Sequence, residues 1–478
     1  MGTSKKSKLI PLSVLHRRFA FWALTVFLVK ILISINIPDA KFPINGEPFL
    51  LKGMWLGADG ENYITGYQSL KNDGIYSTNS FLSYWPAGYP IFILFLSFIG
   101  ESWLFFIINF VQSLFYSVAV FFFALQLSKT RLRNFSSLVL IFLLLNPTLS
   151  LSSICVGYES LASSGLILIL GLLIQDLIVN SNRVFWRNLT FAALILGFIS
   201  FLQPRLILSG LVGVLIWVLV RKTLKTAVII LIIATAIVAT SPILLILRNQ
   251  SANGFAAIST NLGITMNLGA GDDVDGSYKP REKHGVPCPK IEGNAAEQDS
   301  HLVSCVIKWN LSNPAKSAEL LLNKALYFWT PWSGPEAVGS MARNPWLKVN
   351  PIIDIASNSV EGNRLVYGNT GKIISWIWML ASIALLITGF RTLWRAQGLE
   401  RVVSVFAASQ ILLNLFISMG TLGDHRQRLP IMGMSVFLQV IGLKVITNRK
   451  KNHLVSGPSL PSRSSDLLIE IKGKQAVT

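Results

Sequence analysis

Apolar residues gather along this chain in long runs that short polar segments separate. A membrane-spanning helix needs about 20 largely apolar residues. Ten runs approach or reach this length, so the pattern predicts about ten transmembrane helices. The helices are expected at residues 19–37, 102–127, 135–151, 159–179, 189–203, 205–220, 226–247, 372–391, 401–420 and 429–446.

The short segments between these runs alternate in charge. Every second segment is rich in lysine and arginine, which marks the cytoplasmic side of a membrane protein. Both termini are therefore predicted to lie in the cytoplasm. The basic residues of these segments are Lys129, Arg131, Arg133, Arg183, Arg187, Arg221, Lys222, Lys225, Arg391, Arg395, Arg401, Arg449, Lys450 and Lys451.

The N-terminus also carries basic residues before an apolar run, as a cleaved signal peptide would. The run is too long for a signal peptide, and residues 36–39 lack the small residues of a cleavage site. We interpret it as a retained first helix.

Two segments on the predicted outer side are long. In the first, residues 88–100 are apolar but too short to span, so they are expected to lie on the membrane or dip into it. The second is mixed polar and long enough for a small folded cap. The predicted fold is an all-α polytopic membrane protein with juxtamembrane helices and this cap. Its parts are a transmembrane catalytic module at 1–247 with the first outer loop at 38–101, an outer loop domain at 248–371, C-terminal helices at 372–447 and a disordered cytoplasmic tail at 448–478.

The overall composition agrees with this pattern. Hydrophobic residues make up 52% of the 478 residues, only 14% are charged, and these values exclude a soluble globular chain. The formal net charge of +19 could suggest nucleic acid as a partner. Because most basic residues lie in short segments between apolar runs, the charge indicates membrane topology instead, and no nucleic-acid partner is predicted.

Asp59 is the strongest candidate for chemistry. It lies just after the first predicted helix, in the sequence GADGENY at 57–63. A hydroxyl or amine acceptor loses a proton as it attacks, and a positioned carboxylate can take that proton as a general base. The alternative is an Asp-Gly turn on a solvated loop.

An aromatic segment follows, YWPAGYP at 84–90. Proline and glycine shape its backbone, and its rings suit the positioning of a substrate. The residues predicted to position a substrate are Tyr63, Trp85, Tyr89 and His425.

Three further ionisable residues lie at predicted outer helix ends. Glu159 opens the fourth apolar run, where it could assist Asp59 or only complement the helix dipole. Arg205 lies in a tight outer turn, where it could bind a phosphate or an ordinary lipid headgroup. Lys30, in the outer half of the first helix, could extend to the outer interface or face an anion inside the bundle.

The last outer turn, GDHRQRLP at 423–430, contains two arginines. Basic residues are depleted on this side, so Arg426 and Arg428, flanked by His425, are predicted to hold a phosphate. The alternative is a charged loop that only keeps the turn soluble.

Metal and cofactor motifs are lacking in the sequence. No Cys-x-x-Cys, no histidine pair at metal-ligand spacing and no glycine-rich nucleotide loop occurs, so neither a metal nor a cofactor is predicted. An enzyme of this kind would use an already activated, lipid-linked donor. Cys288 and Cys305 share the second outer segment, and whether they form a disulfide is open.

These residues together resemble the GT-C fold membrane glycosyltransferases that use polyprenyl- or dolichyl-phosphate sugars, especially the protein O-mannosyltransferase and aminoarabinose transferase families. Asp59 corresponds to that family's catalytic aspartate in the first outer loop. Residues 85–90 are similar to its aromatic Pro-Pro-Gly-Tyr-Pro segment, with Ala87 in place of a proline. Glu159 matches an acid at the start of the fourth helix.

The remaining matches lie in outer turns. Arg205 resembles an arginine after the fifth helix, in Pro-Arg order where the family has Arg-Pro. Residues 426–430 resemble its closing Arg-Tyr and Leu-Pro, with Gln427 in place of tyrosine. The resemblance implies an inverting, metal-independent glycosyltransferase in which Arg205, Arg426, Arg428 and Lys30 hold the donor phosphate.

The expected partners are a polyprenyl-phosphate sugar, an acceptor of unknown kind (lipid, glycan or protein) and membrane lipid. A prokaryotic plasma membrane is favoured over the endoplasmic reticulum as the location. The rival interpretation is a transporter or flippase of a lipid-linked sugar. Such proteins place ionisable residues near the membrane midplane, whereas the ionisable residues here lie mostly at helix ends.

Overall fold

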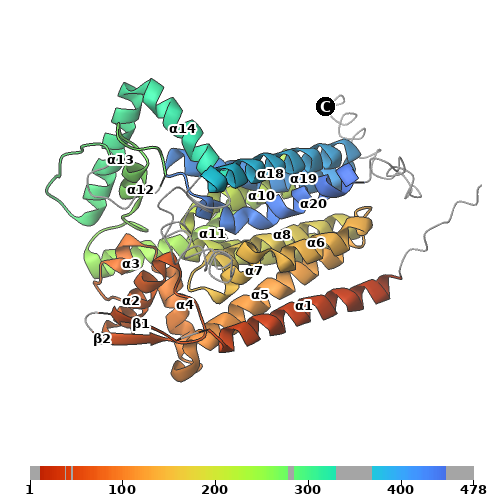
Figure 1. The fold of residues 1–478 in the computed structure, drawn as a ribbon, viewed down its shortest axis with the longest axis horizontal. Coiled ribbons are helices and arrows are strands. Elements are labelled where there is room, and N and C mark those ends of the chain that lie inside the picture. The colour runs from red at the N-terminus through yellow and green to blue at the C-terminus, as the bar shows by residue number, and fades with distance from the viewer. Residues whose placement is uncertain (1–10, 38, 45–46, 278–284, 330–368, 448–478) are drawn as a thin grey trace, which may run out of the picture.

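The computed structural model describes residues 11–37, 39–44, 47–277, 285–329 and 369–447. Long helices lie side by side in a bundle, with the first outer loop and the cap helices at one end of it (Figure 1). Within the described residues, nine helices are long and apolar enough to cross a membrane, or up to ten if a bent pair counts as one span. The chain is thus an all-α, multi-pass integral membrane protein, as predicted.

The long helices follow the predicted apolar runs with small shifts at their ends. The largest shifts are at the starts of α1 and α9, which begin at Leu12 and Asn182 instead of 19 and 189, and at the end of α11, which continues past 247 to Asn253. The bundle helices are α1 (Leu12–Ile35), α5 (Leu104–Leu127), α6 (Arg133–Leu145), α8 (Glu159–Val179), α9 (Asn182–Leu202), α10 (Ile207–Arg221), α11 (Leu224–Asn253), α18 (Asn369–Ala396), α19 (Gly398–Gly420) and α20 (Met432–Thr447).

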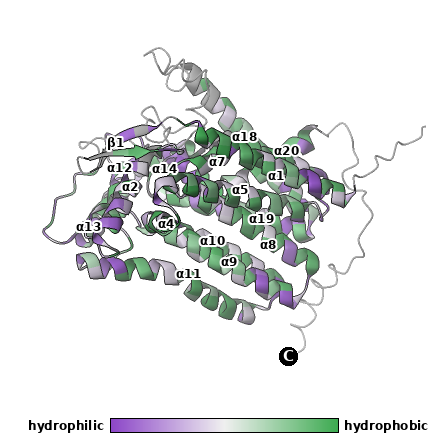
Figure 2. Cartoon of the chain, turned by 90° about the horizontal axis from the view of Figure 1, so that it is seen from below, coloured by the Kyte–Doolittle hydropathy of each residue, from purple (hydrophilic) through white to green (hydrophobic). Residues whose placement is uncertain are grey.

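Apolar side chains on the outside of the bundle fit a lipid environment. On α1, Leu24, Leu28 and Leu32 recur at helical spacing, and each side chain is at least half exposed. Figure 2 shows hydrophobic residues along the long helices and hydrophilic ones gathered toward the helix ends and on α13. In lipid this apolar surface does not have to be buried by other helices.

The predicted single helix at 135–151 is wrong in one respect. The structure breaks it into α6 and the short α7 (Pro147–Leu151), and the segment Thr148–Ile154 is bent by 55° from α6. Proline has no N–H for the helix and excludes helical geometry from the residue before it, and Asn146 is extended, with ψ 113°. The Asn146 side chain then accepts a hydrogen bond from Leu149 N at 2.8 Å, which starts α7.

The first outer loop contains three helices and a small antiparallel sheet. The sheet, β1 (Ala40–Ile44) and β2 (Glu47–Leu51), was not predicted. Its strands are followed by α2 (Gly57–Asp73), α3 (Phe81–Tyr84) and α4 (Gly88–Ser97).

Helix α4 confirms the short helix predicted within 88–100. It begins against the backbone of α9, because a methyl group on Gly88 would lie 1.8 Å from the carbonyl oxygen of Phe201. Only glycine allows this approach of two backbones, which explains the glycine in the aromatic segment.

The described part of the cap consists of α12 (Leu262–Leu268), α13 (Ala295–Ser312) and α14 (Pro314–Trp329). Cys288 and Cys305 form a disulfide with a Cα–Cα distance of 6.1 Å, which settles the pairing that the sequence left open. The rest of the predicted cap, from 330 to 368, and the predicted disordered tail from 448 lie outside the described residues.

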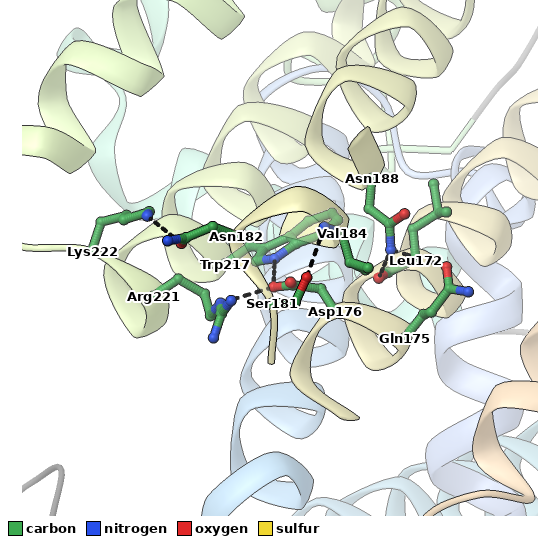
Figure 3. A network of polar contacts seen from close by, with 10 residues as sticks. All are labelled: Leu172, Gln175, Asp176, Ser181, Asn182, Val184, Asn188, Trp217, Arg221 and Lys222. Atoms are coloured by element: carbon green, nitrogen blue, oxygen red, sulfur yellow. Dashed lines mark hydrogen bonds and ion pairs between the residues drawn. The ribbon is translucent and has the colours of Figure 1, made fainter. Parts of the chain in front are cut away.

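At the opposite end of the bundle, a buried polar network joins three helices (Figure 3). Asp176 of α8 is fully buried, accepts a hydrogen bond from Trp217 Nε1 at 2.9 Å and pairs with Arg221 Nε at 3.2 Å. Asn188 of α9 donates to the carbonyl oxygen of Leu172 at 3.0 Å. These bonds connect α8 to α9 and α10.

Candidate functional site

Asp59 and Arg426, far apart in sequence, meet at the end of the bundle that carries α2, α4 and the cap helices. Asp59 lies in the first turn of α2, where a negative charge favours the helix N-terminus. Arg426 lies in the 3₁₀ helix η5 (His425–Ile431), directly before α20. Asp59 Oδ2 and Arg426 Nη1 are 3.4 Å apart, and their side chains are 15% and 21% exposed, so the pair is still accessible from outside.

Tyrosine rings connect this pair to the start of α8. Tyr63, one turn after Asp59, is 3% exposed. Its ring centroid lies 5.1 Å from that of Tyr89 and 6.5 Å from that of Tyr158. Edge-on contacts at these distances stabilise aromatic clusters, so α2, α4 and the residue before α8 form one packed unit.

Tyr158 also brings the turn between α9 and α10 into the site. Its hydroxyl accepts hydrogen bonds from Gln203 Nε2 at 2.8 Å and from Arg205 Nη2 at 3.3 Å. Arg205 belongs to the short 3₁₀ helix η3 (Pro204–Leu206). The structure therefore joins the predicted Arg205 to the same cluster as Asp59.

Glu159 follows Tyr158 as the first residue of α8. It is 5% exposed, and a methyl group on Gly157 would lie 2.5 Å from its Oε2, so the carboxylate folds back over the Gly157 backbone. Its place beside Tyr158 puts a second acid within the cluster. Its position at a helix N-terminus also fits the purely structural interpretation.

The predicted positioning residue Tyr89 is a support of the site in this conformation. It is fully buried; its hydroxyl donates to Gln112 Oε1 at 3.0 Å and accepts from Gly157 N at 3.0 Å. Gln112 in turn donates to the carbonyl oxygens of Ser153 and Cys155 at 2.9 and 3.1 Å. Tyr89 and Gln112 thereby fix the segment that leads into α8.

The other predicted positioning residues, Trp85 and His425, also pack inside the protein. Trp85 is partly buried, and its ring centroid lies 5.1 Å from that of Tyr84. His425 is fully buried, with Nδ1 3.4 Å from Asp424 Oδ1. Asp424 also accepts a hydrogen bond from Arg426 N at 2.8 Å, which holds the turn that presents Arg426. Their predicted role toward a substrate stays a prediction.

Arg428 has a different environment from Arg426, although the sequence predicted one role for both. It is 2% exposed; its Nη1 donates to the carbonyl oxygen of Trp329 at 3.0 Å, and its guanidinium lies 4.9 Å from the Trp378 ring. Residues two apart in a 3₁₀ helix point about 240° apart. Arg428 therefore joins η5 to α14 and α18, while Arg426 faces Asp59.

Lys30 lies inside the bundle. It is 1% exposed, and its ammonium lies 4.2 Å from the ring centroid of Tyr116 in α5. No described residue forms a hydrogen bond with its Nζ. Tyr116 is one helical turn from Gln112, so Lys30 is linked to the site through α5 rather than by a contact with Asp59, Arg205 or Arg426.

Sequence reasoning missed Tyr158, Gln203 and Arg248. Arg248 is 5% exposed and donates to the carbonyl oxygens of Ile75 and Leu82 at 3.1 and 3.3 Å, and also to that of Ser77. It thus attaches the outer end of α11 to the first outer loop. A basic residue on the outer side was the signal that singled out Arg205 and Arg426, and it could have found Arg248 as well.

The cluster offers a carboxylate, guanidinium groups and phenols at one end of a membrane bundle. Such groups can accept a proton and bind an anion. Within the part of the chain that the structure describes, no group of three or more His, Cys, Asp and Glu side chains could hold a metal ion.

Comparison with known proteins gives a weak structural similarity and no similarity in sequence. No protein-family model matches the chain, and no curated protein matches it. A similar solved structure is that of the archaeal oligosaccharyltransferase AglB from Archaeoglobus fulgidus in complex with an inhibitory peptide and a dolichol-phosphate. The match has 13% sequence identity and a TM-score of 0.43, and it covers 95% of this chain and 54% of that chain.

The chain thus spans about half the length of the structure it matches. Neither the identity nor the TM-score is high enough to assign a family or an activity. The protein itself is a multi-pass helical membrane protein with an acidic, basic and aromatic cluster at one end of its bundle.

Proposed function

We propose that the protein is an inverting glycosyltransferase that moves a sugar from a polyprenyl-phosphate donor to an acceptor on the extracytoplasmic side. One observation carries the proposal. Asp59 of the first outer loop, Tyr158 before α8, Arg205 after α9 and Arg426 before α20 come together at one end of the bundle. A carboxylate with two guanidinium groups supplies a base and a phosphate ligand, which this reaction requires.

The chemistry assigns a role to each charge. The oxygen of the acceptor hydroxyl forms a bond to the anomeric carbon, and Asp59 takes its proton. The bond from that carbon to the phosphate oxygen breaks, and its electron pair leaves with the polyprenyl phosphate. Attack opposite to the leaving group inverts the anomeric carbon. Arg205 and Arg426 stabilise the negative charge that develops on the phosphate.

The pair of Asp59 and Arg426 suggests the order of events. In the free protein the two charges neutralise each other at 3.4 Å. A donor phosphate competes for Arg426, and its binding weakens the ion pair and so raises the proton affinity of the Asp59 carboxylate. Donor binding would thus prepare the base. We assign the assisting role to Glu159, the residue after Tyr158, whose negative charge would raise the proton affinity of Asp59.

The predicted phosphate ligands do not contribute equally in this proposal. The Arg428 guanidinium is already held by the Trp329 carbonyl and two tryptophan rings. Lys30 lies against Tyr116. We therefore assign the phosphate to Arg205 and Arg426, with Lys30 as a contact deeper along the lipid.

The test is transfer of radiolabelled sugar from a panel of polyprenyl-phosphate sugars, in membranes that contain the wild type or Asp59→Asn. Loss of a general base lowers turnover by about 100-fold or more. We expect label transfer by the wild type, almost none by Asp59→Asn, and donor binding nearly unchanged in the variant. Glu61→Gln, two residues away and exposed, is the matched control and should keep its activity. Retained turnover in Asp59→Asn would refute the assignment of the base.

A flippase of a lipid-linked sugar is the second candidate. The observation in its favour is Lys30, a cation 1% exposed within the helical bundle, since ionisable residues at such positions often mark a transport path. Reconstitution in liposomes separates the two functions. Movement of a lipid-linked sugar across the bilayer without transfer to any acceptor would favour the flippase.

A further inference from the structure

A second buried cation lies at the junction of the cap and the bundle. Lys324 of α14 is only 5% exposed. A methyl group on Gly423 would lie 2.6 Å from its Cα, and a methyl group on Gly269 would lie 3.2 Å from its Nζ. The backbones of the cap loop (residues 269–277) and of the last outer turn (residues 423–430) therefore close around the side chain, and its ammonium ends beside Gly269.

No described residue pairs with this ammonium by a hydrogen bond or ion pair. The carboxylate considered first is Asp275, which directly precedes Gly276. Gly276 packs against the Lys324 side chain. The Asp275 carboxylate already accepts hydrogen bonds from Ser277 N at 2.9 Å and Tyr327 Oη at 3.1 Å. Burial lowers the pKa of Lys324 to about 8, so the side chain still carries its charge at neutral pH. A buried cation without an anion is costly to maintain, which is a common property of ligand sites.

The position of Lys324 relates it to the candidate site. Gly423 N donates to the carbonyl oxygen of Gly276 at 2.9 Å, so the last outer turn and the cap loop are joined beside Lys324. Gly423 directly precedes Asp424, which holds the backbone of Arg426. One short turn therefore packs on Lys324 and presents Arg426 to Asp59.

We propose that Lys324 binds an anionic group, a phosphate or a carboxylate, on a substrate of this site. The group belongs either to the donor sugar or to the acceptor, and in both cases it approaches from the cap side. The identity of the substrate rests on the proposed glycosyl transfer. The binding of an anion at Lys324 does not, so it can be tested without any transfer activity.

The experiment uses the full chain in detergent and measures thermal unfolding at pH 7 in chloride, inorganic phosphate or acetate at equal ionic strength. Four proteins are compared: the wild type, Lys324→Met, Lys324→Arg and Lys316→Met. Lys316 is a matched control because it lies on the same helix and already pairs with Glu319. Ligands that bind the folded state raise the unfolding temperature, so titration gives an apparent affinity.

We expect phosphate or acetate to stabilise the wild type and Lys316→Met equally. Lys324→Met should bind the anion at least about tenfold more weakly, since it loses a hydrogen bond to a charged group. Lys324→Arg should keep most of the response. In chloride, Lys324→Met should be no less stable than the wild type, because it removes an unpaired buried charge.

Two results would overturn the proposal. One is a wild type that responds to neither phosphate nor acetate. The other is a Lys324→Met variant that keeps the response of the wild type, in which case Lys324 only supports the cap loop.

Where transfer is detected, the source of the anionic group follows from kinetics. If Lys324→Met raises the KM only for the donor, the anionic group belongs to the donor sugar. If it raises the KM only for the acceptor, the anionic group belongs to the acceptor. If Asp59→Asn retains turnover but Lys324→Met loses its anion response, the proposed base fails and the anion site stands.

Discussion

Arg426 and Arg428 are two residues apart and make opposite kinds of contact. Arg426 pairs with Asp59 and stays partly accessible, whereas Arg428 is enclosed by a carbonyl and two tryptophan rings. Both are arginines in a short turn on the predicted outer side, where the positive-inside rule predicts few basic residues. Their difference comes from the pitch of η5 and cannot be derived from residue type.

Replacing each arginine by glutamine should therefore have different effects. Arg426→Gln should weaken binding of polyprenyl phosphate by about 10- to 100-fold, because it loses a hydrogen bond to a charged group. It should change the unfolding temperature little. Arg428→Gln should lower the unfolding temperature, because it leaves a buried carbonyl and two ring faces without their cation. Binding of a labelled polyprenyl phosphate and thermal unfolding distinguish the two. The same loss of affinity in both variants would contradict the separation of roles.

Lys324 makes stability depend on pH in a defined direction. Burial lowers its pKa from 10.5 to about 8 in the folded protein. Between these values the unfolded chain binds more protons than the folded one, so stability rises with pH through this window, by at most about 3 kcal/mol. Burial and then the charge of Asp275 raise the pKa of Tyr327 to about 12, so this neighbour keeps its proton.

The difference in unfolding temperature between wild type and Lys324→Met should accordingly change between pH 7.5 and 10. The variant lacks the group, so its advantage over the wild type should shrink as pH rises. A difference that stays constant with pH would mean that Lys324 has an ordinary pKa in the folded state.

The sequence identified single residues of the site better than their contacts. Asp59, Glu159, Arg205 and Arg426 could be selected because each is an ionisable residue in a predicted outer loop or turn, or at the outer end of a predicted helix. Their meeting depends on helix packing across the bundle, and no local pattern records that. Tyr158 was missed because a tyrosine beside an apolar run is ordinary in a membrane protein.

Among the helices, close contact of α4 with α9 shows why one position in the aromatic segment is glycine. The carbonyl oxygen of Phe201 occupies the space where a side chain of residue 88 would begin. The sequence predicted the helix from its apolar residues and could not predict this contact. The break at Pro147, by contrast, could have been predicted, because proline interrupts helices. A single helix was predicted there because the apolar run continues past Pro147.

Gly88→Ala should destabilise the protein by about 1–3 kcal/mol or more, because α4 has to move away from α9 to fit the methyl group. Thermal unfolding is the measurement. Gly100→Ala is the control, since a methyl group there would meet only Ile107 Cδ1 at an ordinary 3.5 Å. Equal effects of the two substitutions would show that the contact of α4 with α9 is looser than described.

In the molecule as a whole, the described parts of both predicted outer segments lie at the same end of the bundle, and α1 begins and α20 ends at the other (Figure 1). This arrangement agrees with the alternation of charge along the chain. Charge bias predicts which end faces the cytoplasm. The fold alone does not show which end of the bundle faces the cytoplasm.

Cysteine labelling in intact cells tests the orientation. A membrane-impermeant maleimide should react with Asp272→Cys in the cap loop and leave Lys225→Cys unlabelled until the cells are permeabilised. Both positions are exposed, and the natural cysteines are either buried or in a disulfide, so they give a low background. The reverse labelling pattern would invert the topology and remove the candidate site from the outer face.

The buried pair of Asp176 and Arg221 has a consequence for biosynthesis. α8 leaves the ribosome with its carboxylate, whereas the matching guanidinium follows only after α9 and nearly all of α10 have been made. A lone charge is costly inside a bilayer. We therefore expect α8 to become stable in the lipid only once α10 has arrived, so that the three helices enter as a group.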